Sequence, residues 1–558
     1  MKTTFHYDHY YDYEEMTNCL CTLQQTFPDF MEMESICVSE EGKQIWAVTL
    51  TDQSTGPAME KPAYYMDGNH HAGEVTGSMA CMHLIDVLLT NHDRKEMSRL
   101  LKETAIYVIP KISPDGSDEY LHTANKLRSV NRLYPNAQLD DGLHAEDVNG
   151  DGIIAMMRVK TPYGAWKKRK DDDFVMTKRL PDDQEGEFYN IYSEGTIINY
   201  DGVHIKIGSE KWGLDFNRNY PFGWFIESRQ PGAGKYPLSN PENKAVADFV
   251  IAHKNIGSVL TMHTTGGVLV YPPGTMPSKD ASQEDMRMYR EIGEMATQEM
   301  GYPAVNIFDN FLQDTINYSS GAFDDWCYHT QGIPAYTVEL WNVKERAGCK
   351  QQWPVKRDKS DAEKEEEFLK VSTWVKEHCP DAILPWTHCT HPQLGDVEIG
   401  GLDFKFTCQN CPPAYLLQEM EKTTAFALRH AKVLPKLEIS ALQVTQMSEH
   451  LFQIDAVIAN KGYLPTYICE EAKTAEVNQP LRIQLENVEV LTQTGTIEEL
   501  SGFFNIRTEY GYDGIETNNY APAAKKMTWV VKGEKGQKAV LIVQGEKAGM
   551  ARAEMILE

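Results

Sequence analysis

Apolar residues in the first two thirds of the chain alternate between a strand-like and a helix-like period. Longer stretches at 75–89, 240–253 and 278–298 have helical periodicity, and the second of these begins with Asn240-Pro241-Glu242, a helix-start signal. Strands alternating with helices favour an α/β domain with a largely parallel or mixed sheet. The short apolar runs that predict strands lie at 44–50, 63–66, 105–112, 258–262 and 335–340.

The pattern changes near Pro435, where short alternating runs replace the helix-like stretches. Turn signals such as Asn460-Lys461-Gly462 separate these runs, a rhythm typical of a small β-sandwich. We therefore predict an α/β domain over 1–386, a connecting segment over 387–434 and a sandwich-like domain over 435–558. The charged run 361–367 predicts a helix face in water. The predicted sandwich strands lie at 451–458, 481–485, 488–491, 527–531 and 539–543.

Composition fits a globular protein of several domains. The chain has 558 residues, 41% of them hydrophobic and 24% charged, which suits two to four domains. A formal net charge of −27 disfavours nucleic-acid binding, because phosphate recognition needs clustered cations. We expect no membrane span, since no run of eighteen apolar residues occurs. Eleven cysteines without an apolar signal core suggest reduced thiols and a cytoplasmic protein, although a secreted chain without its signal would look the same.

Two fragments carry residues suited to zinc. His71 and Glu74 are three positions apart just after a predicted strand, so their side chains can face one point. His263 follows another predicted strand and can supply a third ligand, which leaves a fourth position for water. The alternative for each histidine is an ordinary hydrogen bond in a loop.

Two further fragments carry charged groups in unusual settings. Asn217 and Arg218 are adjacent, and a guanidinium fork beside an amide can hold a carboxylate or polarise a carbonyl. Glu339 lies at the end of an apolar strand, where a carboxylate is unfavourable unless another group pairs with it or it takes part in binding or catalysis. An edge-strand glutamate facing water is the plainer interpretation of Glu339.

Taken together, these fragments resemble the zinc carboxypeptidase A family (peptidase family M14) from roughly Tyr10 to Trp386. The resemblance implies a mixed-sheet domain holding one catalytic zinc ion through His71, Glu74 and His263. It also implies that Glu339 is the general base and that Asn217 and Arg218 hold the C-terminal carboxylate of a peptide. Two further motifs occur in the same order along the chain as in the family. They are Ser113-Pro114-Asp115-Gly116 and, after the third ligand, Tyr271-Pro272.

The family's remaining site residues align less directly. The arginine that polarises the scissile carbonyl corresponds by gapless count to Asn131, so Arg132 or Arg128 is the candidate. The family's mobile tyrosine corresponds to Asn317, next to Tyr318. Asp324 occupies the position before the Asp-Trp pair, which in the family lines the floor of the pocket for the C-terminal side chain. A carboxylate there predicts a preference for Lys or Arg, unless the altered Ser-Gly run turns Asp324 toward solvent.

An insertion of the aligned domain spans 133–216, near the site. Within it, 147–154 matches the first eight positions of an EF-hand loop, with Asp147, Asn149 and Asp151 as calcium ligands. The twelfth position is Arg158 instead of glutamate, so the loop is incomplete. Calcium and a metal-free acidic turn both stay open, and the insertion could form a rim that restricts substrate size.

The predicted activity is zinc-dependent hydrolysis of the C-terminal peptide bond of peptides. One alternative is a zinc amidase acting on peptidoglycan stem peptides, which also carry a free carboxylate. Another is a catalytically inactive binding protein of the same fold. A second zinc site is a weaker hypothesis, because the cysteines and histidines near its Cys-x-x-Cys pair lack regular spacing. Its members would come from Cys379, His388, Cys389, His391, Cys408 and Cys411.

Overall fold

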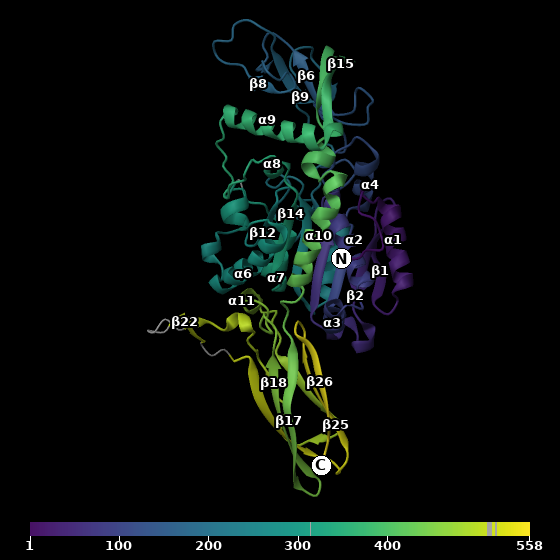
Figure 1. The fold of residues 1–558 in the computed structure, drawn as a ribbon, viewed down its shortest axis with the longest axis vertical. Helices are drawn as coiled ribbons and strands as arrows, with labels where there is room; N and C mark the ends of the chain where they lie inside the picture. The colour runs from purple at the N-terminus through teal and green to yellow at the C-terminus, as the bar shows by residue number, and fades with distance from the viewer. Residues whose placement is uncertain (313, 511–515, 519–521) are drawn as a thin grey trace.

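A computed structural model describes residues 1–312, 314–510, 516–518 and 522–558. Three tiers follow one another along the long axis of the molecule (Figure 1). An α/β domain occupies the middle, a small sheet with helix α9 (Asp361–His378) lies at one end, and a β-sandwich lies at the other. Among the described helices, none is long and apolar enough to cross a membrane.

The middle tier is built on a mixed eight-stranded sheet. Its strand order is β1-β2-β4-β3-β11-β14-β12-β13. The central strands β4, β3, β11 and β14 run parallel, while β1, β2 and β12 form antiparallel pairs. The strands are β1 (Met31–Val38), β2 (Gln44–Leu50), β3 (Ala63–Gly68), β4 (Ala105–Ile109), β11 (Ile256–Thr264), β12 (Val268–Tyr271), β13 (Ala304–Asn306) and β14 (Ala335–Leu340).

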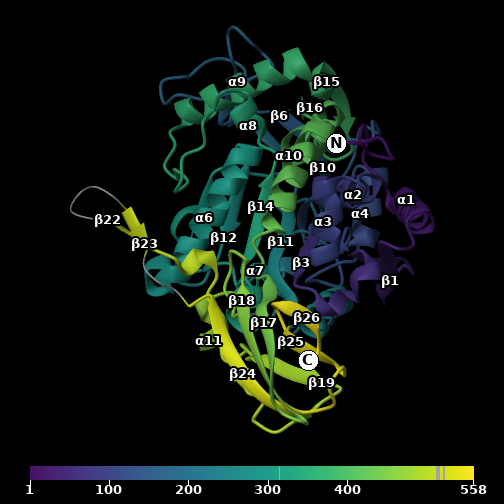
Figure 2. The ribbon, with the colours of Figure 1, turned by 60° about the horizontal axis from the view of Figure 1, so that its bottom comes forward.

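Helices cover both faces of this sheet, so its central strands are buried on both sides and read as continuous apolar runs. Tyr64 and Met66 of β3 face one core, whereas Ala63 and Tyr65 face the other. The first core packs against α1 (Tyr13–Thr26), α2 (Val75–Thr90), α6 (Gln283–Met300) and α10 (Pro413–His430). The second packs against α5 (Pro241–Ala252) and α7 (Phe323–Gln331), of which α7 is labelled in Figure 2.

The small sheet at the upper end, which we call the cap sheet, combines two distant parts of the chain. Its order is β15-β16-β6-β9-β7-β8. Four strands come from the insertion and two from the segment after α9. The strands are β6 (Met156–Lys160), β7 (Trp166–Lys168), β8 (Met176–Lys178), β9 (Tyr189–Ser193), β15 (Ile383–His391) and β16 (Gly395–Leu402), and β5 (Gly142–Ala145) and β10 (Gly195–Ile198) form a separate pair.

The C-terminal tier is a sandwich of two four-stranded antiparallel sheets around one apolar core. Lys547, in the turn after β25, donates to the carbonyl oxygen of Ile256 at 3.0 Å, at the start of β11. The sandwich therefore contacts the strand ends opposite to those that carry His263. Its sheets comprise β17 (Leu437–Ser448), β18 (Leu451–Asn460), β24 (Ala524–Lys532) and β20 (Glu489–Val490), and β21 (Thr496–Ile497), β19 (Leu481–Glu486), β25 (Lys538–Gly545) and β26 (Gly549–Ile556).

The predicted fold class, an α/β mixed-sheet domain followed by an all-β domain, is confirmed. The segment 387–434 is more than a connection, because it supplies most of β15, all of β16 and the whole of α10. Helix α10 packs into the middle tier, where His83 contacts Thr424 at 2.6 Å and Arg429 pairs with Glu299 at 2.7 Å. The 361–367 face is not wholly solvated either, since Glu365 pairs with Arg169 of the insertion at 2.8 Å.

The remaining helical elements lie within or between these tiers. They are α3 (Lys95–Glu103), α4 (Pro114–His122), α8 (Val343–Arg346), α11 (Glu470–Thr474), the 3-10 turns η1 (Gln53–Thr55), η2 (Ala58–Glu60), η3 (Phe216–Arg218), η4 (Ser278–Asp280), η6 (Pro380–Ala382) and η8 (Phe503–Asn505), and the wider turns η5 (Ile307–Phe311) and η7 (Phe404–Gln409). A short pair of strands, β22 (Thr508–Tyr510) and β23 (Glu516–Asn518), extends from the sandwich (Figure 1).

Candidate metal centre and active site

The loop after β3 places two of the predicted ligands. Asn69 adopts a left-handed backbone conformation (φ 65°), which asparagine tolerates better than most residues. Its side-chain amide donates to the carbonyl oxygen of His71 at 2.7 Å and fixes the turn. Glu74 then occupies the position just before the first residue of α2. The loop therefore brings His71 and Glu74 to one side of the strand end.

A close helix–strand contact brings the third ligand near. Gly77 in α2 packs so tightly on β11 that a Cβ atom there would lie 2.8 Å from the carbonyl oxygen of Met262. A larger residue would push α2, and Glu74 at its start, away from His263. The backbone N–H of Thr264 also donates to the Glu74 carboxylate at 3.1 Å.

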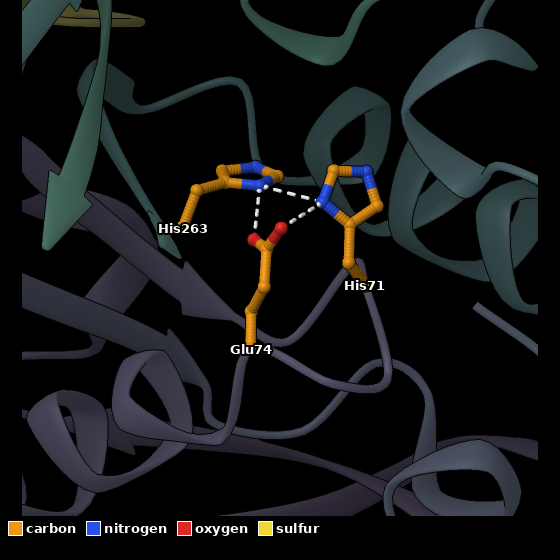
Figure 3. Close-up of side chains that lie close together, drawn as sticks. All are labelled: His71, Glu74 and His263. Carbon is orange, nitrogen blue, oxygen red and sulfur yellow. Dashed lines mark hydrogen bonds and ion pairs between the residues drawn. The ribbon is translucent and has the colours of Figure 1, made fainter. Parts of the chain in front are cut away.

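The three side chains converge on one point (Figure 3). The Nδ1 atoms of His71 and His263 lie 3.1 Å apart, and each lies within 2.9 Å of a Glu74 oxygen. All three residues are buried. Burial alone would raise the pKa of Glu74, but the charges of His71 and His263 lower it. Among the described residues, this is the one group of three or more potential ligands close enough to hold a metal ion.

This donor set fits zinc. Two imidazole nitrogens and one carboxylate, with one position left for water, form a usual zinc site in hydrolases. Two nitrogens bound to one tetrahedral zinc at about 2.0–2.1 Å lie about 3.3 Å from each other, close to the 3.1 Å between these Nδ1 atoms. Without a cation, two ring nitrogens and a carboxylate would share this buried point.

A carboxylate outside the ligand group orients His71. Asp215, the cap of η3, lies 3.0 Å from His71 Nε2, which leaves Nδ1 directed at the metal point. Its second oxygen accepts from Arg128 Nε at 2.8 Å. Burial would raise the pKa of Asp215, but the positive charges of Arg128 and His71 hold it well below its usual range. Asp215 was not predicted as a site residue from the sequence, although it lies two residues before Asn217.

Glu339 lies one strand away from the ligand group. Parallel pairing of β11 with β14 sets Glu339 opposite His263. Burial and the nearby Glu74 carboxylate raise the pKa of Glu339 to about 7. In the described structure no hydrogen-bond donor engages this carboxylate. A carboxyl group with that pKa can exchange a proton near neutral pH.

Asn217 and Arg218 lie in η3, directly after Asp215. The Asn217 side-chain oxygen accepts from the backbone N–H of Phe323 at 2.8 Å, which ties η3 to the start of α7. The Arg218 guanidinium donates to the carbonyl oxygen of Asn217 at 2.6 Å and to Ser319 Oγ at 3.2 Å. Five N–H groups are present in a guanidinium, so donors remain for a carboxylate ligand.

Asp324 does not face solvent, because only 4% of its surface is exposed. Its carboxylate accepts from Thr337 Oγ1 at 2.7 Å and from the backbone N–H of Asp325 at 2.9 Å. Its charge also contributes to the raised pKa of Glu339, two positions after Thr337 on β14. The idea that the altered Ser-Gly run turns Asp324 into solvent is therefore wrong.

The remaining residues predicted from the family alignment lie at different distances from the ligand group. Arg128 approaches the ligand group, with Nη1 3.5 Å from Glu74. Arg132 instead pairs with Glu40 at 3.1 Å, and Asn131 donates to Glu41 at 2.6 Å. The Tyr318 ring packs on Phe225, with ring centroids 5.3 Å apart.

The incomplete EF-hand loop satisfies its own backbone. The Asp147 carboxylate accepts from the N–H groups of Gly150 and Gly152, and Asp151 accepts from that of Ile153 at 2.9 Å. Arg158, at the twelfth position, pairs with Glu398 on β16 at 2.9 Å. Asn149 donates to Asp151 at 2.9 Å. These contacts are those of an acidic turn, and calcium has no support here.

The candidate second zinc site has no comparable geometry. Cys408, Cys411 and the other cysteines are free thiols. The Cys411 sulfur contacts the Tyr10 hydroxyl at 3.3 Å. No second group of potential ligands gathers in the described part of the chain.

A buried centre of two histidines and one glutamate at the ends of parallel strands is typical of a zinc-binding protein. The family model described as zinc carboxypeptidase (Peptidase_M14) matches residues 16–369. The chain belongs to this family, and the predicted resemblance is confirmed. A second model, described as a domain of unknown function (DUF8731), matches residues 436–556.

Individual relatives are distant. The chain is 22% identical to carboxypeptidase O of Bos taurus over 347 residues, which cover 60% of this chain and 72% of that protein. It is 32% identical to carboxypeptidase A1 of Rattus norvegicus over 142 residues, covering 24% and 33%. The crystal structure of thrombin activatable fibrinolysis inhibitor (TAFI) is similar with a TM-score of 0.43 and 18% identity, covering 77% of this chain and 78% of that one.

Proposed function

We propose that this protein is a zinc-dependent carboxypeptidase that hydrolyses the C-terminal peptide bond of peptides. The convergence of His71, Glu74 and His263, with Glu339 opposite His263 on the next strand, carries this proposal. Zinc bound there supplies a water of lowered pKa and polarises the scissile carbonyl.

The remaining steps belong to side chains of this chain. Glu339 accepts the proton of the attacking water and passes it to the leaving amine. Burial and the Glu74 charge raise the pKa of Glu339, and a zinc ion bound beside it would lower that pKa again, so that the carboxylate can accept the proton. Arg128, held by Asp215, directs its guanidinium toward the developing oxyanion.

Substrate binding follows from the η3 turn. Asn217 and Arg218 hold the free carboxylate of the substrate, which limits cleavage to the last residue of the peptide. Asp324 forms the floor of the side-chain pocket and favours a C-terminal Lys or Arg. Tyr318 lies near the Ser319 contact of Arg218 and closes over the bound end of the peptide.

A peptide library with free C-termini, and the same library with amidated C-termini, tests the proposal. Mass spectrometry should detect single released residues only from the free peptides. Glu339→Gln should keep its zinc but lose at least about 10²-fold in turnover, as expected for a lost general base. His263→Ala should lose the metal. Cleavage of amidated peptides at equal rate, or near wild-type turnover by Glu339→Gln, would contradict the proposal, and release from muropeptides alone would favour the stem-peptide amidase.

A further inference from the structure

A second cavity lies between the cap sheet and helix α9, outside the zinc site. Its volume is about 440 Å³, within the range of small-molecule sites. The inner face of the cap sheet forms one side, and the start of α9 and the η7 turn form the other. The insertion and the 361–409 segment together therefore build a pocket that neither builds alone.

Most side chains that line this cavity, which we call the cap pocket, are apolar, and five of them are aromatic. They are Trp166, Phe174, Phe368, Trp386 and Phe404. Large apolar residues remain in water at its edge, with Met156 and Phe404 each 41% exposed and Phe368 37% exposed. Clustered exposed apolar side chains mark binding sites in soluble proteins. An apolar ligand entering the cap pocket would cover these surfaces.

The charged groups of the lining favour an anion. Lys126 lies over the Phe404 ring at 5.0 Å, and Lys178 lies over the Trp166 ring at 4.1 Å. Together with Lys364, these lysines line the pocket without a carboxylate partner in the described part of the chain. Burial lowers the pKa of Lys126 despite the opposing charge of Asp403, so a further anion beside it would stabilise its charge.

The acids of the lining do not cancel this preference. Glu365 accepts from Arg169 at 2.8 Å and from Thr177 at 2.5 Å, so its carboxylate is already paired with other groups. Asp361 lies in the first turn of α9, where the helix dipole stabilises a negative charge. The lining therefore holds three lysines and one acid without an ion-pair partner, Asp361, while the Asp403 charge acts on Lys126 from outside the lining.

We propose that the cap pocket binds an apolar monocarboxylate, such as an aromatic or medium-chain aliphatic acid. The apolar body fills the space between the aromatic rings, and the carboxylate pairs with the lysines. A lysine ammonium group that lies over an aromatic ring still has N–H donors available to an anion. The site is independent of the zinc centre and of the proposed peptidase activity.

Titration calorimetry with naphthalene-2-carboxylate and with the neutral naphthalene-2-carboxamide tests this proposal on the full chain. The two probes share size and shape, so their difference reports the charge. We expect saturable 1:1 binding of the acid and at least about tenfold weaker binding of the amide, a difference typical of one charged contact. The Arg218→Ala variant should bind the acid equally, because the candidate carboxylate site near the zinc centre is then removed.

Variants locate the site. Phe368→Ser and Phe404→Ser should each weaken binding of the acid at least about fivefold, since they remove exposed rings of the pocket. Leu180→Ser and Phe503→Ser are matched controls, because these apolar residues are 57% and 56% exposed outside the pocket. The triple variant Lys126→Ala, Lys178→Ala, Lys364→Ala should abolish the preference for the acid, and it decides the question if the phenylalanine variants misfold. No saturable binding, equal binding of both probes, or binding lost in Arg218→Ala would overturn the proposal.

Discussion

The Nε2 atom of His71 lies 3.0 Å from the Asp215 carboxylate, whose other oxygen accepts from Arg128. One buried carboxylate thus fixes both a metal-ligating imidazole and the guanidinium beside it. Its lowered pKa, due mainly to the positive charge of Arg128 despite burial, keeps it ionised at neutral pH. Asp215 is therefore a positioning residue for two different parts of the site.

Replacing this carboxylate should weaken zinc binding while the fold survives. Asp215→Asn keeps an oxygen for the Asn217 N–H but removes the charge that orients His71. We expect a 10- to 100-fold loss of zinc affinity, roughly the usual effect of losing such an outer partner. Competition with a chromophoric chelator measures it. Asp201→Asn, at an exposed position of the insertion, should change nothing, and equal zinc affinity in both variants would refute this role of Asp215.

Replacing each of the two candidate arginines should have clearly different effects on kcat/KM. Arg128→Ala should lower kcat/KM by about 10²- to 10³-fold, the range for one lost oxyanion donor. Arg132→Ala should stay within about twofold, because a partly exposed ion pair with Glu40 contributes little. Zinc content must be measured in both variants, since Arg128 also holds Asp215. Comparable losses in both variants would contradict the assignment of the oxyanion role to Arg128 alone.

The sequence predicted those parts of the site that depend on local pattern. His71, Glu74 and His263 lie at ends of strands whose apolar runs are clear, and the strands 44–50 and 335–340 were predicted with their observed bounds. Arg128 and Arg132 could not be separated, because one turn of irregular chain decides which arginine faces Glu74 and which faces Glu40.

Long-range pairing explains what the sequence did not predict. The cap sheet joins β6 to β16, for example Arg158 to Glu398, across 240 residues, and no local period reports such a contact. Helix α10 was assigned to a connecting segment because its apolar residues follow an irregular chain, yet they complete the core against α2 and α6. Asp215 was overlooked for the same reason, since its partner His71 lies 144 positions away.

Two adjacent carboxyl groups should make stability depend on pH. Burial and the neighbouring Asp324 charge raise the pKa of Asp325 to about 7 in the folded protein. An unfolded aspartate titrates near about 3.9, so folding takes up a proton between these values. This contribution to stability is complete below the unfolded pKa and is lost as pH rises through the folded pKa.

Asp325→Asn removes this titration and keeps an oxygen for the N–H of Gly274. The free energy of unfolding of the variant should exceed that of wild type by roughly 1–4 kcal/mol more at pH 8 than at pH 4. The reason is that only wild type loses stability over that range. Urea denaturation at both pH values measures the difference. The variant Asp248→Asn, at an exposed helix position, serves as the control. A constant difference between Asp325→Asn and wild type at the two pH values would show that Asp325 does not titrate in this window.

Substrate preference should depend on the carboxylate of Asp324. Thr337 and the Asp325 backbone hold this buried side chain in one orientation. Because 4% exposure leaves little water to solvate it, a cationic C-terminal side chain would be bound favourably and an anionic one repelled.

Peptides that differ only in their last residue test this preference. Wild type should release Lys or Arg at least about tenfold more efficiently than Leu or Phe, and C-terminal Glu least of all, since a buried like charge is strongly disfavoured. Asp324→Ala should reverse the order in favour of apolar residues, because the pocket then keeps its shape but loses its charge. Zinc content and Tm should be compared with wild type, so that a misfolded variant is not taken for altered specificity. An apolar preference in wild type that Asp324→Ala leaves unchanged would show that this carboxylate lies outside the substrate pocket.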